Sequence, residues 1–169
     1  MFLKSIALPL FVSLICAGAT PAEERLTKEV HKALATLPYY SVFDDLSYRI
    51  NGDTVELFGE VTKPVLKDDA VTAVKHIEGV KQVKDNIEVL PLSPTDDGIR
   101  IALYRAIYGN PSLNRYLLQP VPSIHIIVKN GNVTLAGVVA NEMDKTIAYL
   151  QARSVPGTFN VTNKLRVEK

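Results

Sequence analysis

The heptapeptide Val-Glu-Leu-Phe-Gly-Glu-Val at residues 55–61 decides the fold, because it returns at residues 133–139 as Val-Thr-Leu-Ala-Gly-Val-Val. Both copies have the form V-x-L-x-G-x-V and lie 78 residues apart. The same offset pairs Gly79 with Gly157, Val83 with Val161, Ile87 with Leu165, and Val89 with Val167. A constant offset maintained from residue 55 to residue 89 indicates an internal duplication.

The first copy predicts the order helix, strand, strand, helix, strand. Apolar residues recur at helical spacing over residues 25–37. Alternating residues on either side of Asn51-Gly52 predict a hairpin, because both turn residues tolerate a positive φ. Pro64 marks the start of the second helix, and residues 83–89 alternate as the last strand.

The second copy predicts the same order. A helix is expected near residues 97–108, and Asn130-Gly131 joins the strands of a hairpin. Asn141 has the position of a helix cap, and the helix it begins is expected to end near residue 154. Residues 159–167 supply the last strand. The first connection of this copy, residues 110–122, is longer than its counterpart.

The predicted fold class is therefore α+β, with two αββαβ modules, each a small three-stranded sheet packed against two helices. The expected domains are residues 25–90 and 97–169, joined by a stiff proline-containing linker at 91–96. Gly59 and Gly137 fall inside strands, where we expect a helix to pack closely against the sheet. The two cores should use nearly every apolar side chain and leave only surfaces for binding.

The N-terminus has the pattern of a secretory signal peptide at residues 1–19. Lys4 precedes an apolar run of about ten residues, and small residues lead to an expected cleavage after Ala19. An uncleaved N-terminal anchor is one alternative. Lipoprotein anchoring through Cys16, the only cysteine, is a minor alternative, because Ile15 and Ser13 suit lipidation poorly. The expected location is the periplasm.

No pattern for catalysis, a cofactor or a metal is present, and we expect a non-enzymatic protein. His31, His76 and His125 are isolated from one another, which favours structural or solvated histidines over metal ligands. Paired acids such as Asp96-Asp97 fit a helix N-terminus better than acid–base catalysis. Because 19 basic residues face 18 acidic ones, no nucleic-acid partner is expected, and the oligomeric state is left open.

The first helix of the second copy supplies the candidate binding surface. One stripe of this helix is predicted to face the core. Several apolar, aromatic and basic residues lie towards the opposite side of the helix. These candidates are Arg100, Ile101, Tyr104, Arg105 and Tyr108. Aromatic and guanidinium groups together suit the headgroup level of an anionic phospholipid membrane.

Two other interpretations of this surface stay open. The same residues can pack against the first copy or against the loop at 110–122, and exposed apolar residues can also bind a protein partner. A weaker candidate is a lysine-rich face of the first copy, for which a solvated surface is the default interpretation. Its residues are Lys63, Lys67, Lys75, Lys81 and Lys84.

The two motifs, V-x-L-x-G-x-V and the G-V-x-x-V-x-x-x-I-x-V of residues 79–89, resemble the BON domain of bacterial osmotic-shock and nodulation proteins. The second copy matches the latter motif less well, because Pro156-Gly157-Thr158-Phe159 replaces its valine-rich start. The resemblance implies a periplasmic protein that binds phospholipid or another envelope surface and supports envelope integrity or osmotic-stress tolerance. It supplies no catalytic residue. The rival hypothesis is a protein-interaction or chaperone-like adaptor in the periplasm.

Overall fold

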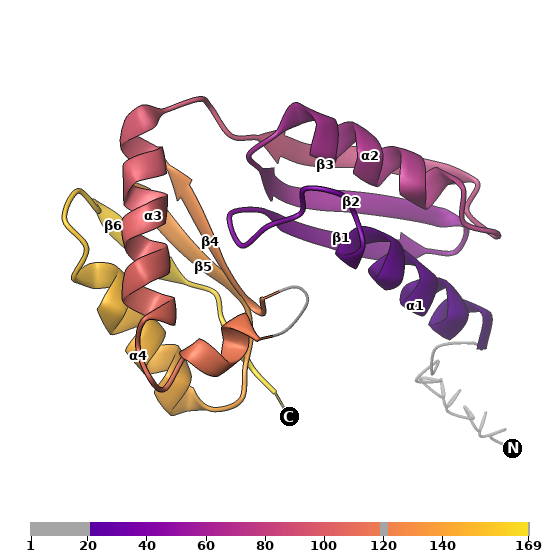
Figure 1. The fold of residues 1–169 in the computed structure, drawn as a ribbon. Coiled ribbons are helices and arrows are strands. Elements are labelled where there is room, and N and C mark those ends of the chain that lie inside the picture. The colour runs from indigo at the N-terminus through magenta and orange to yellow at the C-terminus, as the bar shows by residue number, and fades with distance from the viewer. Residues whose placement is uncertain (1–20, 119–121, 169) are drawn as a thin grey trace, which may run out of the picture.

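The computed structural model describes residues 21–118 and 122–168 and contains two α+β modules (Figure 1). The expected signal peptide, including Cys16, lies outside the described residues. The helices are α1 (Pro21–Ala35), α2 (Pro64–Lys75), α3 (Pro94–Tyr108) and α4 (Glu142–Arg153), with a 3-10 helix η1 (Asn114–Leu117). The strands are β1 (Asp45–Asn51), β2 (Thr54–Val61), β3 (Gln82–Val89), β4 (Ile124–Lys129), β5 (Asn132–Val139), β6 (Asn160–Asn163) and β7 (Arg166–Val167).

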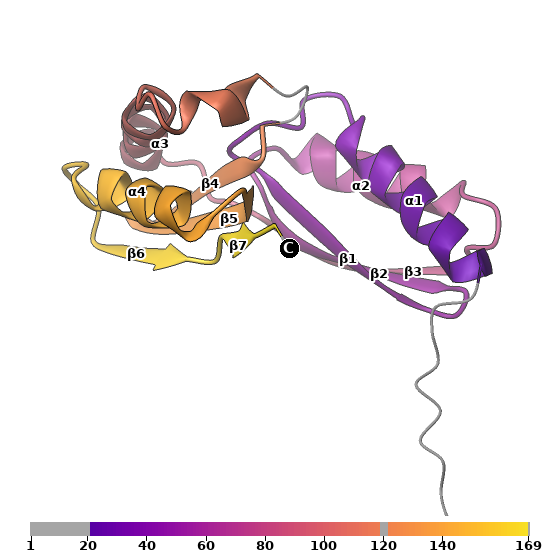
Figure 2. The ribbon, with the colours of Figure 1, turned by 90° about the horizontal axis from the view of Figure 1, so that it is seen from below.

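Module one contains α1, β1, β2, α2 and β3 in that order, as the sequence predicts. Its sheet has the order β1-β2-β3, with β1 antiparallel and β3 parallel to the central β2. Both helices cover one face of the sheet (Figure 2). The helix expected at 25–37 is placed at Pro21–Ala35, so it ends before Pro38.

Module two repeats this arrangement with α3, β4, β5, α4 and β6. Its helix α3 begins at Pro94, inside the stretch 91–96 that was expected to be a linker. The expected cap at Asn141 is confirmed, because its side-chain oxygen accepts a 2.9 Å hydrogen bond from the N–H of Asp144. The last strand, expected as one element, is divided into β6 and β7, which both pair with β5 in parallel.

Gly59 and Gly137 are required by the neighbouring strand, and the expectation that a helix packs against them is wrong. Both have left-handed backbones, with φ of +120° and +112°. A Cβ on Gly59 would lie 2.0 Å from the carbonyl oxygen of Asp45 in β1. A Cβ on Gly137 would lie 2.0 Å from that of Ser123, just before β4. Only glycine fits at these two positions of close backbone approach.

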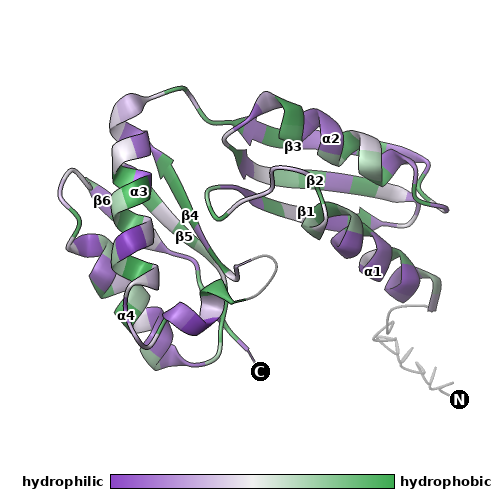
Figure 3. Cartoon of the chain, in the orientation of Figure 1, coloured by the Kyte–Doolittle hydropathy of each residue, from purple (hydrophilic) through white to green (hydrophobic). Residues whose placement is uncertain are grey.

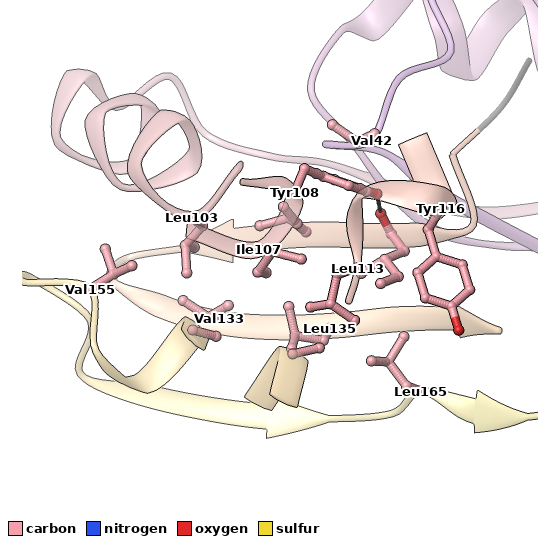
Figure 4. Packing of buried hydrophobic residues seen from close by; sticks show 14 of the residues in the cluster. Val42, Leu103, Ile107, Tyr108, Leu113, Tyr116, Val133, Leu135, Val155 and Leu165 are labelled. Atoms are coloured by element: carbon pink, nitrogen blue, oxygen red, sulfur yellow. Dashed lines mark hydrogen bonds between the residues drawn. The ribbon is translucent and has the colours of Figure 1, made fainter. Parts of the chain in front are cut away.

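Each module has its own hydrophobic core, but the core of module two also contains a residue of module one. Val42 comes from the loop between α1 and β1 and is 7% exposed. Figure 4 shows it near Tyr108 among the side chains of the second core. In the main chain, the N–H of Ile126 in β4 donates a 2.7 Å hydrogen bond to the carbonyl of Val42. Module one therefore completes the core of module two.

β4 is buried on both of its faces, unlike the other strands. Residues 124–128 are all buried, and the strand is coloured hydrophobic over most of its length in Figure 3. One face meets the helices of module two. On the other face, the ring of His125 lies 5.5 Å from the ring of Tyr40 in module one. This double burial explains why β4 is nearly continuously apolar.

Charged residues of opposite sign also meet between the modules. The ammonium of Lys129 in β4 pairs with the carboxylate of Glu88 in β3. The acidic neighbours Asp45 and Glu88 raise the pKa of Glu60 in β2, and the basic Lys129 and Lys164 of module two lower it. Burial, followed by repulsion from Asp45, raises the pKa of Glu60 above its ordinary value of 4.5.

We expect the substitution Glu60→Gln to stabilise the protein at neutral pH and to have little effect in acid. Because the pKa of Glu60 is raised, the folded state favours the protonated carboxyl group. The resulting stability is complete below pH 4.5 and is lost as the pH rises through the raised pKa, where the charged carboxylate destabilises the fold. Urea unfolding below pH 4.5 and at pH 7 measures this. Glu56→Gln is the control with opposite sign, because a hydrogen bond with Lys84 lowers the pKa of Glu56. A pH-independent effect of Glu60→Gln would contradict the assignment.

Candidate functional site

Helix α3, which carries the predicted surface, is fixed firmly at its N-terminus. The hydroxyl of Ser93 caps the helix by accepting a 3.2 Å hydrogen bond from the N–H of Asp96. The buried carboxylate of Asp96 then accepts hydrogen bonds from the N–H groups of Asn130 (2.8 Å) and Gly131 (2.9 Å). The first turn of α3 thus holds the β4–β5 hairpin, which gives this acid a structural role.

Arg100 and Tyr108 are buried, so the expectation that they belong to an exposed surface is wrong. Their exposed fractions are 5% and 4%. The phenol of Tyr108 donates a 2.5 Å hydrogen bond to the carbonyl of Ile124. The guanidinium of Arg100 donates a 2.6 Å hydrogen bond to the carbonyl of Val128. Burial raises the pKa of Tyr108, which keeps the phenol protonated as a donor.

Together with Val42, these two side chains cap the outer edge of β4. An edge strand has main-chain groups without a partner strand, which other chains can pair with. Ile124, Ile126 and Val128 are alternate residues of β4, and each has an outward main-chain group bonded to Tyr108, Val42 or Arg100 respectively. Sequence reasoning missed this role because it depends on contacts of β4 with α3 and with a loop of module one, which are distant in the chain.

Tyr104 is half-buried between aromatic residues of both modules. Its ring centroid lies 5.2 Å from that of Tyr108 and 6.3 Å from that of Phe43. Phe43 belongs to the same loop of module one as Val42. The alternative interpretation, in which these residues pack against the first copy, is therefore correct for Tyr104 and for Tyr108.

Ile101 and Arg105 are the candidates that stay exposed, and Ile101 is 48% exposed. Sequence reasoning considered Leu118 as an additional apolar contact, but it missed two exposed residues on the neighbouring helix α4. Met143 and Leu150 on α4 are 72% and 57% exposed. Their seven-residue separation places them on one side of α4, and this spacing was the signal available in the sequence. Leu118, at the end of η1, is 85% exposed.

The exposed residues of α3 and α4 belong to one structural layer. The two helices lie side by side on the same face of the second sheet (Figures 1 and 2). Because that face of the sheet is covered, side chains that remain exposed on the helices point to solvent. We call Ile101, Arg105, Met143 and Leu150 the helix-layer surface.

The lysine-rich face of module one is occupied mainly by local interactions. Lys67 pairs with Asp85 at 3.2 Å, Lys81 with Asp53 at 2.8 Å and Lys84 with Glu56 at 2.7 Å. The ammonium of Lys63 lies 4.7 Å from the ring centroid of Tyr39. This arrangement agrees with a solvated face and does not gather the charges into one basic patch.

Among residues 21–118 and 122–168, no group of three or more His, Cys, Asp or Glu side chains is arranged to hold a metal ion. His31 and His76 are exposed, whereas His125 is buried in the β4 face described above. Over the same described ranges, every helix is too short or too polar to cross a bilayer.

Comparison with protein families finds the BON domain model twice, at residues 22–91 and 96–169. No curated protein sequence matches the chain. Among solved structures, the chain is similar to the C-terminal domain of CdsD, a structural protein of the type III secretion system of Chlamydia trachomatis. One such structure has 16% identity and a TM-score of 0.30, covering 85% of this chain and 98% of that one. A second CdsD structure has 14% identity and a TM-score of 0.32, covering 86% and 94%. At these values the likeness has no functional implication.

Proposed function

Because the chain belongs to the BON domain family, with two of its domains in tandem, we propose that it is a non-enzymatic protein of the bacterial envelope that binds anionic phospholipid surfaces. The family is non-catalytic in general and is associated with phospholipid binding and osmotic-stress proteins. In this proposal the protein acts in the periplasm and supports envelope integrity or osmotic-stress tolerance.

The observation that supports this proposal most strongly is the exposed apolar character of the helix-layer surface. Ile101 of α3 and Leu150 of α4 are large apolar side chains exposed by about half, and they lie on adjacent helices. The exposed Arg105 on α3 adds a positive charge beside them. In this proposal the side chains form one contiguous patch, and contiguous exposed apolar patches mark interaction sites.

The chemistry of this surface suits the headgroup region of a membrane. A helix lying in the interface inserts apolar side chains by a few ångströms, and basic residues attract anionic headgroups. Each large apolar side chain transferred from water contributes about 1.5–3 kcal/mol, so two of them give modest, reversible binding. The protein would then dock on the membrane through α3 and α4 without spanning it.

We expect the protein to float with vesicles of phosphatidylglycerol and much less with vesicles of phosphatidylcholine. The variants Ile101→Ser and Leu150→Ser should each weaken flotation about tenfold, because each removes one apolar anchor. Arg105→Glu should reduce binding to the anionic vesicles and leave residual binding to neutral ones unchanged. Val65→Ser is the matched control, because Val65 is similarly exposed, at 46%, but lies on α2 of module one.

Three results would contradict the proposal. The protein could fail to float with either lipid, which would favour the adaptor hypothesis. Flotation could be unaffected by Ile101→Ser and Leu150→Ser together, which would move the site elsewhere. Val65→Ser could weaken flotation as much as the other variants. Circular dichroism of each variant establishes that the fold is retained.

A further inference from the structure

A cavity of about 620 Å³ lies between the modules, so the expectation that only surfaces remain for binding is wrong. The end of α1 and the first half of β1 form its wall in module one. Residues of β4 and β5, with Arg166, form the opposite wall in module two. The volume is within the range of about 300–1,000 Å³ that is usual for binding sites. We call this cavity the junction groove.

The first half of β1, from Asp45 to Tyr48, lines the groove continuously. Among the strands that the structure describes, β1 pairs with β2 alone and is an edge strand, and part of it lies close to β4. The offset of 78 residues relates β1 to β4 and places Tyr48 at the position of Ile126. The outward main-chain groups of β1 therefore belong to Leu46, Tyr48 and Ile50.

The outer edge of β1 lacks the caps that block the edge of β4. The buried residues Leu26, Val30 and Leu34 of α1 match Ile99, Leu103 and Ile107 of α3 at an offset of 73. The same offset places Thr27 at the position of Arg100 and Ala35 at that of Tyr108. Neither side chain is long enough to reach the strand in the way that arginine and tyrosine do.

Across the described ranges, one hydrogen bond reaches this edge from outside the sheet, a long 3.4 Å bond from the N–H of Leu46 to the phenol oxygen of Tyr40. The main chain of Tyr48 has no hydrogen bond beyond its pairing with β2. The edge of β4 is thus blocked by Tyr108, Val42 and Arg100, whereas the equivalent edge of β1 is available inside the junction groove.

The opposite wall of the groove contains two polar atoms that lack partners. Nδ1 of His125 and Oγ of Ser123 are buried and have no hydrogen-bond partner among residues 21–118 and 122–168. The His125 side chain as a whole is buried, with 8% exposed. An unsatisfied buried polar group costs about 1–3 kcal/mol, so such groups call for a partner. Both residues line the groove.

We propose that the junction groove binds an extended peptide segment of a partner protein, which adds to module one as a fourth strand beside β1. The main chain of the peptide pairs with Leu46 and Tyr48, in the manner of strand addition to a sheet edge. The Nδ1 atom of His125 and the Oγ atom of Ser123 are closed off from solvent in the free protein, so these side chains turn towards the bound peptide to supply hydrogen bonds from the other side. Apolar side chains of the peptide, which alternate along a strand, contact Leu34 and Val138.

The geometry favours this occupant over two others. Four strand residues span about 13 Å, so the lined part of β1 accommodates a short peptide. The β1 edge of a second copy is flanked by its own α1 and its own module two, which keep it from entering the groove. A lipid would leave the main-chain groups of Tyr48 unpaired, whereas a peptide satisfies them.

The test uses the full chain and a phage-displayed library of random seven-residue peptides with flexible flanks. We expect selection to yield peptides that bind the protein, with affinities measured on synthetic copies by calorimetry. Ala35→Tyr, which places at this position the residue found in module two, should weaken binding at least tenfold by filling the groove. His125→Phe should weaken it about fivefold by removing Nδ1. His76→Phe is the matched control, because His76 is exposed on module one outside the groove lining.

Several outcomes would overturn the proposal. Selection could yield no peptide that binds, or the selected peptides could bind Ala35→Tyr and His125→Phe as tightly as the original protein. Dihexanoyl phosphatidylglycerol below its micelle concentration could shift the amide signals of Tyr48 and His125, which would assign the groove to lipid. Vesicle flotation of Ala35→Tyr should remain unchanged, because Ala35 is not part of the helix-layer surface. The peptide proposal and the membrane proposal can therefore fail independently. Amide spectra of both variants verify their folds.

Discussion

Replacing Gly137 with alanine is expected to destabilise module two by more than about 3 kcal/mol. The new Cβ would lie 2.0 Å from the carbonyl oxygen of Ser123, and the backbone φ of +112° is strained for any residue with a side chain. Relief requires β4 and β5 to separate at the end of the hairpin. Urea unfolding followed by circular dichroism measures the loss, and Gly59→Ala should have a similar effect on module one.

Two other glycines provide matched controls for this effect. Gly98 lies in α3 with open space around its Cβ position, and alanine there should stabilise the helix by about 0.5–1 kcal/mol. Gly52 has a φ of +64° but no nearby atom, so Gly52→Ala should cost about 1 kcal/mol from backbone strain alone. If Gly137→Ala were no worse than Gly52→Ala, the close approach of the strands would not be what demands glycine.

The second large effect is expected from Val42→Asp, a change in module one that should unfold module two. Val42 is 7% exposed within the second core, and a carboxylate there would be buried without a partner. The expected loss is more than about 3 kcal/mol. Amide hydrogen exchange resolved by residue measures it, and protection should fall in β4 and β5 before it falls in β2.

Val65→Asp is the control, because Val65 also belongs to module one but is 46% exposed on α2. It should change stability by less than about 0.5 kcal/mol, as surface substitutions usually do. If Val42→Asp lowered protection in module one alone, the modules would be independent units. A loss in both modules at once would mean that they unfold as a single cooperative unit.

Local sequence signals predicted the fold well where the deciding interaction is short-range. The Asn130-Gly131 turn, the Asn141 cap and the helix start at Pro64 all depend on residues a few positions apart. The turn expected at Asn51-Gly52 is wrong by one residue, because Asn51 pairs with Thr54 at the end of β1 and the turn consists of Gly52 and Asp53. The glycine prediction was half right, because the strand pattern marked Gly59 and Gly137 as places of close approach. It named a helix as the approaching element, whereas the backbone of the adjacent strand takes that position.

The candidate surface was predicted less well, and α3 shows why. Helical periodicity identifies the buried stripe of a helix, but it does not reveal which other segments cover the residues outside that stripe. Arg100 and Tyr108 lie off the main stripe and are buried because the edge of β4 lies beside them. Ile101 and Arg105 lie on the same helix and stay exposed, because none of the segments that the structure describes covers them.

The amino-acid sequence alone determined that this protein is a duplication of one αββαβ unit, because apolar periodicity and turn residues act over short distances and repeat at a fixed offset. The tertiary structure alone decided which strand edge is covered in each unit. Val42 crosses into the second core and completes the cap on β4, while the edge of β1 stays open beside the buried atoms Oγ of Ser123 and Nδ1 of His125. These features depend on contacts between residues far apart in the chain, and no local pattern encodes which of two equivalent edges will be covered.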